Sequence, residues 1–481
     1  MIYHSAAQLA ELIKAKEISS RDLVEAYLSR IDALNPKLHA IVAQNRELTR
    51  KEAILADESA LPASELAPLH GVPVTVKESF NMQGFKTTVN YPPLKNFEPD
   101  EDSLIVKRLR DAGAIILGKT NVPLLLADCQ TFGPLYPTCN NPYDITRVPG
   151  GSTGGGACAV ASGMTTFEIG SDIGGSIRNP AHYCGLFGLK PTQNGHVQDG
   201  HIPPLPGTGN GYLDMNSTGP LARTMRDIEL AYKLVYSPRW DYQRYLPVAR
   251  DHARHSSLAG YRVAWFDEIH GIGCSNDTRK VLSAMCDTLS AKGAKVEKIS
   301  IDKKLSEQMY KCWVKLFGFV VGQDFKWPLR KAMQLKFAHD LNGSRIKAKK
   351  ELKQGLSLKF KHFSRALREQ QELIAEFEHY FERFDFLISP TSVGPAFKHN
   401  PKHRPIEVDG EHMHYSDYAF AFVMPYNVMR HPVLTVPAGQ SSEGLPIGLS
   451  IAAPHHTEEA LIHFGHLLEA EGFGFKAPEI S

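Results

Sequence analysis

Apolar side chains recur every three to four residues near the start of the chain, a spacing that predicts two amphipathic helices over 5–35. Ser5 and Ser20 are the expected N-caps, because a serine hydroxyl accepts from the free N–H groups of a first helical turn. Pro36 is expected to end the second helix. A third predicted helix, around 44–57, is polar on most faces and should lie on the surface.

Later apolar runs are shorter and predict the strands of a central sheet. The predicted strands are 72–77, 114–118, 164–169, 386–388, 433–436 and 447–453. The predicted helices that accompany them are 102–112, 157–161 and 457–471. Strand, helix and strand at this spacing indicate a parallel pair, so the pattern favours an α/β protein.

The segment from about 305 to 383 is predicted to be helical and differs from its flanks in composition. It carries aromatic residues at 313, 317, 319, 325 and 327, and basic residues outnumber acidic ones from Lys326 to Arg368. An ordinary solvated basic face, with the aromatic side chains in the core, is the favoured interpretation. The alternatives are a cover over the active site with an aromatic-lined entrance, and a basic amphipathic surface that binds anionic membrane.

The charges are balanced, since 54 lysines and arginines stand against 52 aspartates and glutamates, for a formal net charge of +2. This balance argues neither for nor against nucleic-acid binding. The seven cysteines form no Cys-x-x-Cys pair, which favours a reduced, intracellular protein. No signal peptide is visible, and no apolar run approaches the roughly 18 residues of a spanning helix. We therefore expect a cytoplasmic protein with no transmembrane segment.

Metal and nucleotide sites are disfavoured by residue spacing. The histidine pairs 252/255, 412/414 and 455/456 lie in polar stretches without nearby cysteines, so we expect no metal. A phosphate-binding loop would require Gly-Lys-Ser or Gly-Lys-Thr after its glycines, and none follows here. The run Gly154-x-Gly156-x-x-Ala159 loosely matches a dinucleotide fingerprint, but residues 147–150 do not have the pattern of a strand.

The block 147–191 is dense in glycine and holds two serines in tight glycine turns, Ser152 in Gly-Gly-Ser-Thr-Gly-Gly and Ser176 in Asp-Ile-Gly-Gly-Ser-Ile-Arg. Glycine permits positive φ and close approach of backbone to a ligand. A serine on such a turn can be exposed beside several convergent N–H groups, the geometry of a nucleophile with an oxyanion hole. The loop 170–179 follows a predicted strand, where open α/β sheets usually place their chemistry. Ser152 has a local alternative, as the cap of a helix that begins near Gly156.

Lys77 ends the apolar run 72–76, and a lysine at the end of a buried strand is costly unless it is paired or neutral. A neutral lysine is a competent base. Pairing with Glu78 or Asp172 is the alternative. On an extended strand Glu78 points to the opposite side from Lys77, and Asp172 is expected to pair with Arg178 and hold the nucleophile loop.

Five stretches together resemble the amidase signature family over most of the chain. They are GVPVTVKESF at 71–80, DAGAIILGKTN at 111–121, the glycine-serine block, FDFLISPTSVGPA at 384–396, and NVMRHPVLTVPAG with GLPIGLSI at 427–451. The resemblance implies one amidase domain over 1–481, in which a substrate cover remains one of the alternatives for the helix-rich segment 305–383. It also implies the fold of that family, a mixed, mostly parallel central sheet covered by helices on both faces.

In that family a Ser–cis-Ser–Lys triad hydrolyses amides. The resemblance therefore implies Ser176 as nucleophile, Ser152 as the serine that follows a cis peptide bond, and Lys77 as base. The N–H groups of Ile173, Gly174, Gly175 and Ser176 would form the oxyanion hole. Gly151, Thr153, Asp172 and Arg178 would support this arrangement, without a cofactor.

The activity implied is hydrolysis of a carboxamide through an acyl-serine at Ser176. The alternatives are the glutamine-hydrolysing subunit of a tRNA-dependent amidotransferase, and a binding protein that retains the fold without catalysis. The expected partner is a small-molecule amide, with nucleic acid involved only in an amidotransferase, and a homodimer is compatible with the sequence.

Three departures from the family pattern affect the substrate. They are Thr153 in place of a second serine, Glu78-Ser79 after the lysine, and Met429-Arg430-His431 where small apolar residues are usual. Two alternatives follow for Arg430 and His431: one of them faces a substrate group, or they are simply exposed. We expect the substrate pocket to be lined by residues of the loop 127–137, the aromatic middle segment and the region after Pro425.

Overall fold

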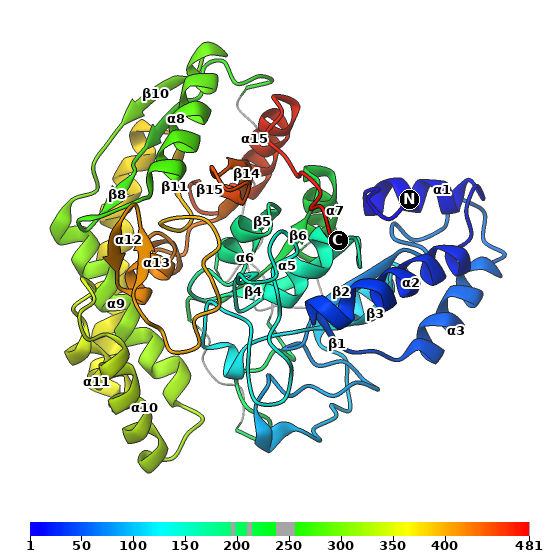
Figure 1. Ribbon diagram of the computed structural model, residues 1–481, viewed down its shortest axis with the longest axis horizontal. Coiled ribbons are helices and arrows are strands. Elements are labelled where there is room, and N and C mark those ends of the chain that lie inside the picture. Colours follow the sequence, from blue (N-terminus) through cyan, green and yellow to red (C-terminus); the bar gives the residue numbers. More distant parts are fainter. Residues whose placement is uncertain (194–197, 209–213, 237–254, 481) are drawn as a thin grey trace.

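The computed structural model describes residues 1–193, 198–208, 214–236 and 255–480, and its elements are labelled in Figure 1. The helices are α1 (Ala6–Lys14), α2 (Ser20–Leu38), α3 (Arg46–Asp57), α4 (Leu104–Asp111), α5 (Gly154–Ala161), α6 (Arg178–Tyr183), α7 (Met225–Tyr236), α8 (Asn276–Ala291), α9 (Lys303–Gly322), α10 (Trp327–Asp340), α11 (Lys349–Leu356), α12 (Phe360–Arg383), α13 (Tyr415–Phe420), α14 (Met424–Val428) and α15 (Glu458–Ala470). The strands are β1 (Ile41–Ala43), β2 (Pro73–Lys77), β3 (Ile115–Thr120), β4 (Phe167–Asp172), β5 (Phe187–Lys190), β6 (Ser217–Ala222), β7 (Arg262–Trp265), β8 (Glu268–Ile269), β9 (Ile272–Gly273), β10 (Lys295–Lys298), β11 (Phe386–Pro390), β12 (Ile406–Val408), β13 (Glu411–Met413), β14 (Val433–Gln440) and β15 (Pro446–Ala452).

A mixed central sheet organises the molecule, with strand order β1-β3-β2-β4-β6-β5-β14-β15-β11-β7-β10. The predicted strand–helix–strand unit over 72–118 is confirmed, because β2 and β3 pair in parallel. The expectation that most pairs would be parallel is wrong, since only β2–β3, β2–β4, β7–β10 and β7–β11 are parallel among the ten described strand pairs of this central sheet. Close neighbours such as β14 and β15 are joined by a short turn, which allows antiparallel pairing only.

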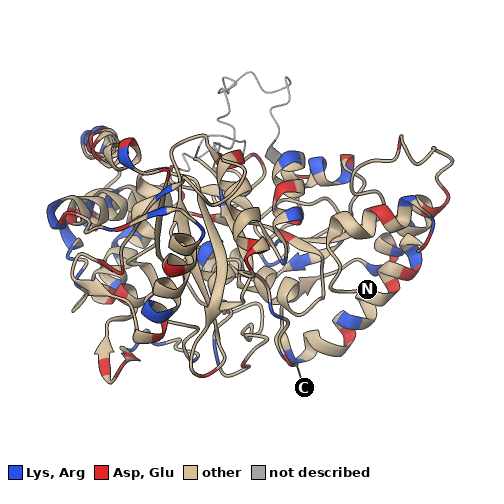
Figure 2. Ribbon diagram, turned by 90° about the horizontal axis from the view of Figure 1, so that it is seen from above, with Lys and Arg blue, Asp and Glu red and all other residues tan. Residues whose placement is uncertain are grey.

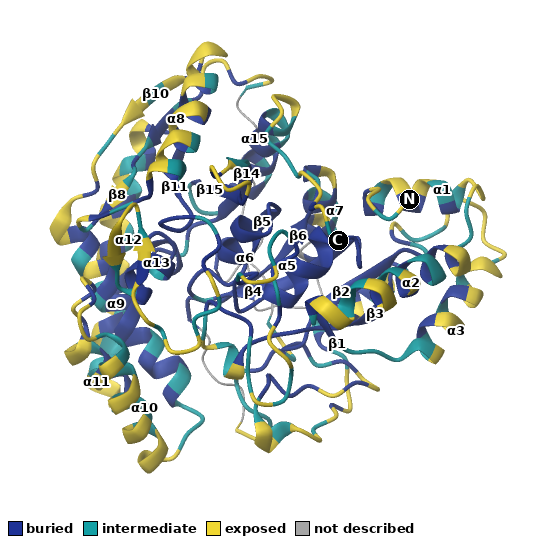
Figure 3. Cartoon of the chain, in the orientation of Figure 1, coloured by how far each residue is buried: buried dark blue, intermediate teal, exposed yellow. Residues whose placement is uncertain are grey.

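Helices cover both faces of this sheet, as expected. Along β5, Leu189 packs into the core cluster shared with α7, α8 and α15. The next residue back, Gly188, faces α6, where an added Cβ would lie 2.7 Å from the Cβ of Ala181. Successive strand residues point to opposite faces, so α6 and α7 lie on opposite sides, and the strands between them are buried (Figure 3).

The first two helices form as predicted, with shifted ends. Ser5 caps α1 in a capping box with Gln8. The cap of α2 is Ser19 and not Ser20, which is its first residue. Pro36 lies inside the last turn of α2, where the missing N–H removes a single hydrogen bond, and His39 at a left-handed φ of 53° ends the helix.

The segment 305–383 is helical, as predicted, and forms α9 to α12 beside the sheet (Figure 1). Trp313 and Phe319 are buried, whereas Trp327 and Phe360 are exposed among lysines. Charges of both signs are interspersed on the outer helices (Figure 2). Within the described ranges, no helix has both the length and the apolar character needed to cross a bilayer. Membrane binding by this segment and the single domain over 1–481 stay predictions.

Candidate active site

Lys77 is the last residue of β2 and is fully buried. Its Nζ donates to Ser152 Oγ at 2.7 Å, to Ser171 Oγ at 2.9 Å and to Ser171 O at 3.3 Å. In the described part of the chain it makes no ion pair with a carboxylate. The alternative of a salt bridge to Glu78 is wrong, because the Glu78 carboxylate accepts from the N–H groups of Thr88 and Val89 instead.

The environment of Lys77 favours the neutral amine. Burial lowers the pKa of Lys77 from its ordinary 10.5 to about 7, and the nearby Asp172 and Glu168 oppose this shift. Burial also raises the pKa of Glu168 to about 8, although hydroxyls of Thr120 and Thr75 donate to it. An amine with a pKa near 7 exists in both protonation states at neutral pH, which suits a proton acceptor that must later become a donor.

Asp172 and Arg178 pair as expected and hold the loop between them. Both side chains are fully buried, with Arg178 Nη2 2.9 Å from Asp172 Oδ1 and Nε 3.0 Å from Oδ2. Burial alone would raise the pKa of Asp172, but the Arg178 guanidinium keeps it well below the usual range. The same carboxylate accepts from the N–H groups of Gly175 and Ile177, so it shapes the turn that carries Ser176.

The backbone of this turn leaves three of the four N–H groups that we expect as oxyanion donors without a protein acceptor among the described residues. Within the described residues, the N–H groups of Ile173, Gly174 and Ser176 donate to no protein acceptor. Gly175 differs, because its N–H donates to Asp172 Oδ1 at 2.8 Å and is therefore not free for a substrate oxygen. The glycines are needed here, since Gly175 has φ +102° and a Cβ at Gly174 would lie 2.9 Å from the Trp313 ring.

The two glycine-framed serines come together through the backbone. The Gly151–Ser152 peptide bond is cis, and the N–H of Thr153 donates to the carbonyl of Ser176 at 3.2 Å. The capping alternative for Ser152 is wrong, because Thr153 occupies the cap position of α5 and makes no side-chain cap. In the described structure no hydrogen bond joins the two serine hydroxyls.

Ser176 lies in the wall of an open cavity of about 120 Å³. Most of the lining is apolar and comes from Trp313, Phe317, Phe337, Leu341, Phe420 and Met424. The loop 127–137 contributes Ala127 and Asp128, and the middle segment contributes α9 to α11, as expected. The region after Pro425 does not line this cavity, whereas His403, Tyr415 and Ser416 do.

The charged groups around this cavity already have partners. Asp128 accepts from the Tyr415 hydroxyl and lies 2.7 Å from His403 Nε2. Lys336 is 3.3 Å from Asp340, one helical turn away. A substrate group that enters the cavity therefore meets a mostly apolar wall with neutralised charges at its rim.

Three polar residues of the site escaped sequence reasoning, and each comes from a separate element. Ser171 accepts from Lys77, and His201 Nε2 lies 2.9 Å from Ser171 Oγ. Burial lowers the pKa of His201 to about 3, so this ring stays neutral. Asn427 donates to Asp172 Oδ1 at 3.0 Å. Ser171 could have been found from strand register, because Val76 pairs with Ile169 and Lys77 thus lies beside the end of β4.

Arg430 and His431 do not line the cavity, contrary to the expectation that one could face the substrate. Arg430 pairs with Asp214 at 3.0 Å. His431 is fully buried and lies 2.9 Å from Glu378. Of the histidines considered for metal binding, His252 lies outside the described residues.

Comparison with known proteins establishes the family. The family model "Amidase" matches residues 22–462. The A subunit of the glutamyl-tRNA(Gln) amidotransferase of Carboxydothermus hydrogenoformans is 30% identical over 98% of this chain and 97% of its own, and that of Geobacillus kaustophilus is 31% identical over 97% and 96%. The structure of 6-aminohexanoate cyclic dimer hydrolase complexed with substrate superposes with a TM-score of 0.82 at 25% identity, covering 100% of this chain and 99% of that one. The chain therefore belongs to the amidase family, a family of amide hydrolases.

Proposed function

We propose that the protein hydrolyses a small carboxamide to a carboxylate and ammonia or an amine through an acyl-serine at Ser176. The observation that carries the proposal is a buried lysine, bound to Ser152 at 2.7 Å and without a carboxylate partner among the described residues. Burial lowers the pKa of this lysine to about 7, so a fraction of the amine is neutral at neutral pH and can accept a proton. Lys119 and Lys190 are also buried and pair with no carboxylate among the described residues, but they donate to Thr87 and to backbone carbonyls. The contact with Ser152 is therefore what distinguishes Lys77.

In the first half-reaction Ser176 Oγ attacks the amide carbon while its proton passes to Ser152 and the Ser152 proton passes to Lys77 Nζ. The carbonyl oxygen becomes an oxyanion and accepts from the N–H groups of Ile173, Gly174 and Ser176. The C–N bond then breaks, and Lys77 returns the proton through Ser152 to the departing nitrogen. Water attacks the resulting ester by the same proton route and releases the acid and free Ser176.

The cavity supports an apolar acyl group. Apolar cavities of about 150 Å³ hold a benzene ring, so a cavity of about 120 Å³ accepts a group of roughly that size or smaller. The rings of Trp313 and Phe317, stacked at 4.6 Å, form one wall. We infer that small aryl or branched aliphatic acyl groups are favoured over long chains.

The second candidate is the glutamine-hydrolysing subunit of a tRNA-dependent amidotransferase, since the relatives above carry such a name and match 97–98% of this chain. Glutamine would place an ammonium and a carboxylate in the cavity, and these need unpaired charges. Asp128 and Lys336, the charged groups nearest the apolar wall, are each already paired. The cavity therefore favours the first candidate.

The test compares the wild-type protein with Ser176→Ala on aryl, branched aliphatic and long-chain amides and on glutamine. Ser176→Ala should lower kcat by about a thousandfold or more, and a fluorophosphonate probe should label the wild-type protein only. Ser257→Ala, an exposed serine, is the matched control and should behave as the wild-type protein. Equal turnover in Ser176→Ala would overturn the assignment. The second candidate would be favoured if glutamine were the only amide hydrolysed and if its hydrolysis required a co-purified partner protein.

A further inference from the structure

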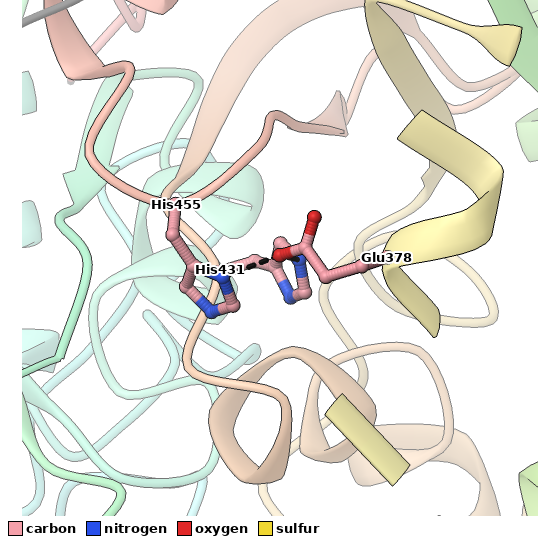
Figure 4. Close-up of side chains that lie close together, drawn as sticks. All are labelled: Glu378, His431 and His455. Atoms are coloured by element: carbon pink, nitrogen blue, oxygen red, sulfur yellow. Dashed lines mark hydrogen bonds and ion pairs between the residues drawn. The ribbon is translucent and has the colours of Figure 1, made fainter. Parts of the chain in front are cut away.

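Three potential metal ligands converge outside the catalytic site, at the edge where α12 meets the ends of β14 and β15 (Figure 4). Glu378 comes from α12, His431 precedes β14 and His455 follows β15. His431 Nε2 lies 2.9 Å from Glu378 Oε1, and His455 Nδ1 contacts the same oxygen. The three ligand atoms lie within 4.8 Å of one another.

A hydrogen bond fixes the position of one hydrogen on His455. Its Nε2 lies 2.8 Å from the carbonyl of Met429, which can only accept, so Nε2 carries the hydrogen. In the neutral ring Nδ1 is then a lone pair, and it faces a carboxylate oxygen in direct contact. Two electron pairs at this separation require a positive centre between or beside them, either a proton or a metal ion.

Protonation of both imidazole rings is unfavourable. Their rings stack with centroids 4.0 Å apart, so double protonation would bring two like charges together. His431 is fully buried between Phe377 and Phe381. Two neutral imidazoles and one carboxylate are a ligand set suited to zinc and similar ions.

We propose that Glu378, His431 and His455 bind one divalent transition-metal ion of the zinc type, with an open fourth position. The side chains of Glu378 and His455 are 35% and 22% exposed, which provides a path for the ion from solvent. His455 has the hydrogen-bonded outer nitrogen typical of metal-bound histidine. His431 Nδ1 has no partner within the described residues, so binding should be weaker than at a site where both rings are so held.

The ion would join the helical segment to the sheet. Glu378 belongs to α12, whereas both histidines flank sheet strands, so metal binding would cross-link segments more than 50 residues apart in the chain. The effect expected is on the stability of the docked α12. The cluster shares no residue with the cavity that contains Ser176.

The experiment uses metal-stripped full-length protein and ZnCl₂ alone, followed by equilibrium dialysis and thermal denaturation. We expect one Zn²⁺ per chain and a rise in Tm. His455→Ala and Glu378→Gln should each weaken binding by at least about tenfold and abolish the rise. His379→Ala is the matched control, because His379 neighbours Glu378 on α12 but is 71% exposed and pairs with Glu382. Both ligand variants are on partly exposed side chains and can be checked for folding by circular dichroism.

Substitution of Co²⁺ separates this cluster from the seven buried free cysteines. Binding by nitrogen and oxygen ligands should give visible d–d bands without the near-ultraviolet charge-transfer band of a Co²⁺–thiolate bond. Failure to bind Zn²⁺ at 100-fold molar excess would overturn the proposal and leave a proton-bridged ion pair only. Undiminished binding in both His455→Ala and Glu378→Gln would also overturn it.

Discussion

Lys77→Met should abolish activity and make the protein more stable. Methionine is close to lysine in length and fits a buried, apolar position, but it cannot accept a proton. The lysine is costly to bury, because its pKa falls from 10.5 to about 7 in the folded protein. At about 1.4 kcal/mol per pKa unit, this shift corresponds to a folding penalty of about 5 kcal/mol at pH 7 and below.

Part of that penalty is offset by the hydrogen bonds that Nζ donates to Ser152 and Ser171. Three such bonds, which the protonated amine can donate with its three N–H groups, contribute roughly 1 kcal/mol each. The net gain expected for Lys77→Met at pH 7 is therefore about 2 kcal/mol. The gain should shrink as pH rises, because between pH 7 and 10.5 the unfolded chain binds the Lys77 proton and the folded chain does not, so the wild-type protein is stabilised by increasing pH.

The assay is denaturant-induced unfolding at pH 7 and pH 9, together with amide turnover. Lys280→Met, a change at a 78% exposed side chain, is the control and should alter neither. Wild-type stability that exceeds that of Lys77→Met at pH 7, or a stability difference that does not change between the two pH values, would refute the reasoning. Retained turnover in Lys77→Met would refute its role as base.

Three further predictions concern the same site. The kcat/KM for an uncharged amide should rise with pH to a plateau with an apparent pKa near 7, and at pH 5 it should be about one hundredth of the plateau, because Lys77 must be neutral to accept a proton; a flat profile from pH 5 to 9 contradicts this. Arg178→Met should destabilise the protein by about 3–5 kcal/mol in denaturant titrations, because it leaves the Asp172 carboxylate buried without its cation; a loss below about 1 kcal/mol would mean that Asp172 is neutral. Trp313→Phe keeps a ring in the cavity wall but loses the N–H that donates to Ile173 O at 2.9 Å, so kcat should fall several-fold while KM changes little; an effect on KM alone would argue for a packing role only.

Local patterns in the sequence predicted the strands and the loop that matter most. β2, β3 and β4 overlap the apolar runs at 72–77, 114–118 and 164–169, although β4 begins three residues later than predicted. The Asp172–Arg178 pair was also predicted, because both residues flank one short glycine turn. Such features depend on residues that are close together in the chain.

Features that depend on distant segments were missed or misjudged. His403 and Tyr415 line the cavity more than 200 residues after Ser176, and nothing in their local sequence marks them. The N–H of Gly175 was expected in the oxyanion hole, and the sequence did not predict that this N–H donates to Asp172. His455 was considered with its neighbour His456, whereas the fold stacks it on His431.

Trp313 lines the acyl cavity and also anchors the carbonyl of the Ile173–Gly174 peptide, whose N–H belongs to Gly174. If the proposed mechanism holds, substrate recognition and rate enhancement are linked in this one indole. In the proposed mechanism, an engineer who enlarges the cavity at this position to admit a bulkier amide also releases the peptide plane whose N–H would bind the oxyanion of the tetrahedral intermediate. New specificity is therefore better sought at Phe337 or Leu341. These side chains line the cavity and have no hydrogen-bonding group that could hold that peptide.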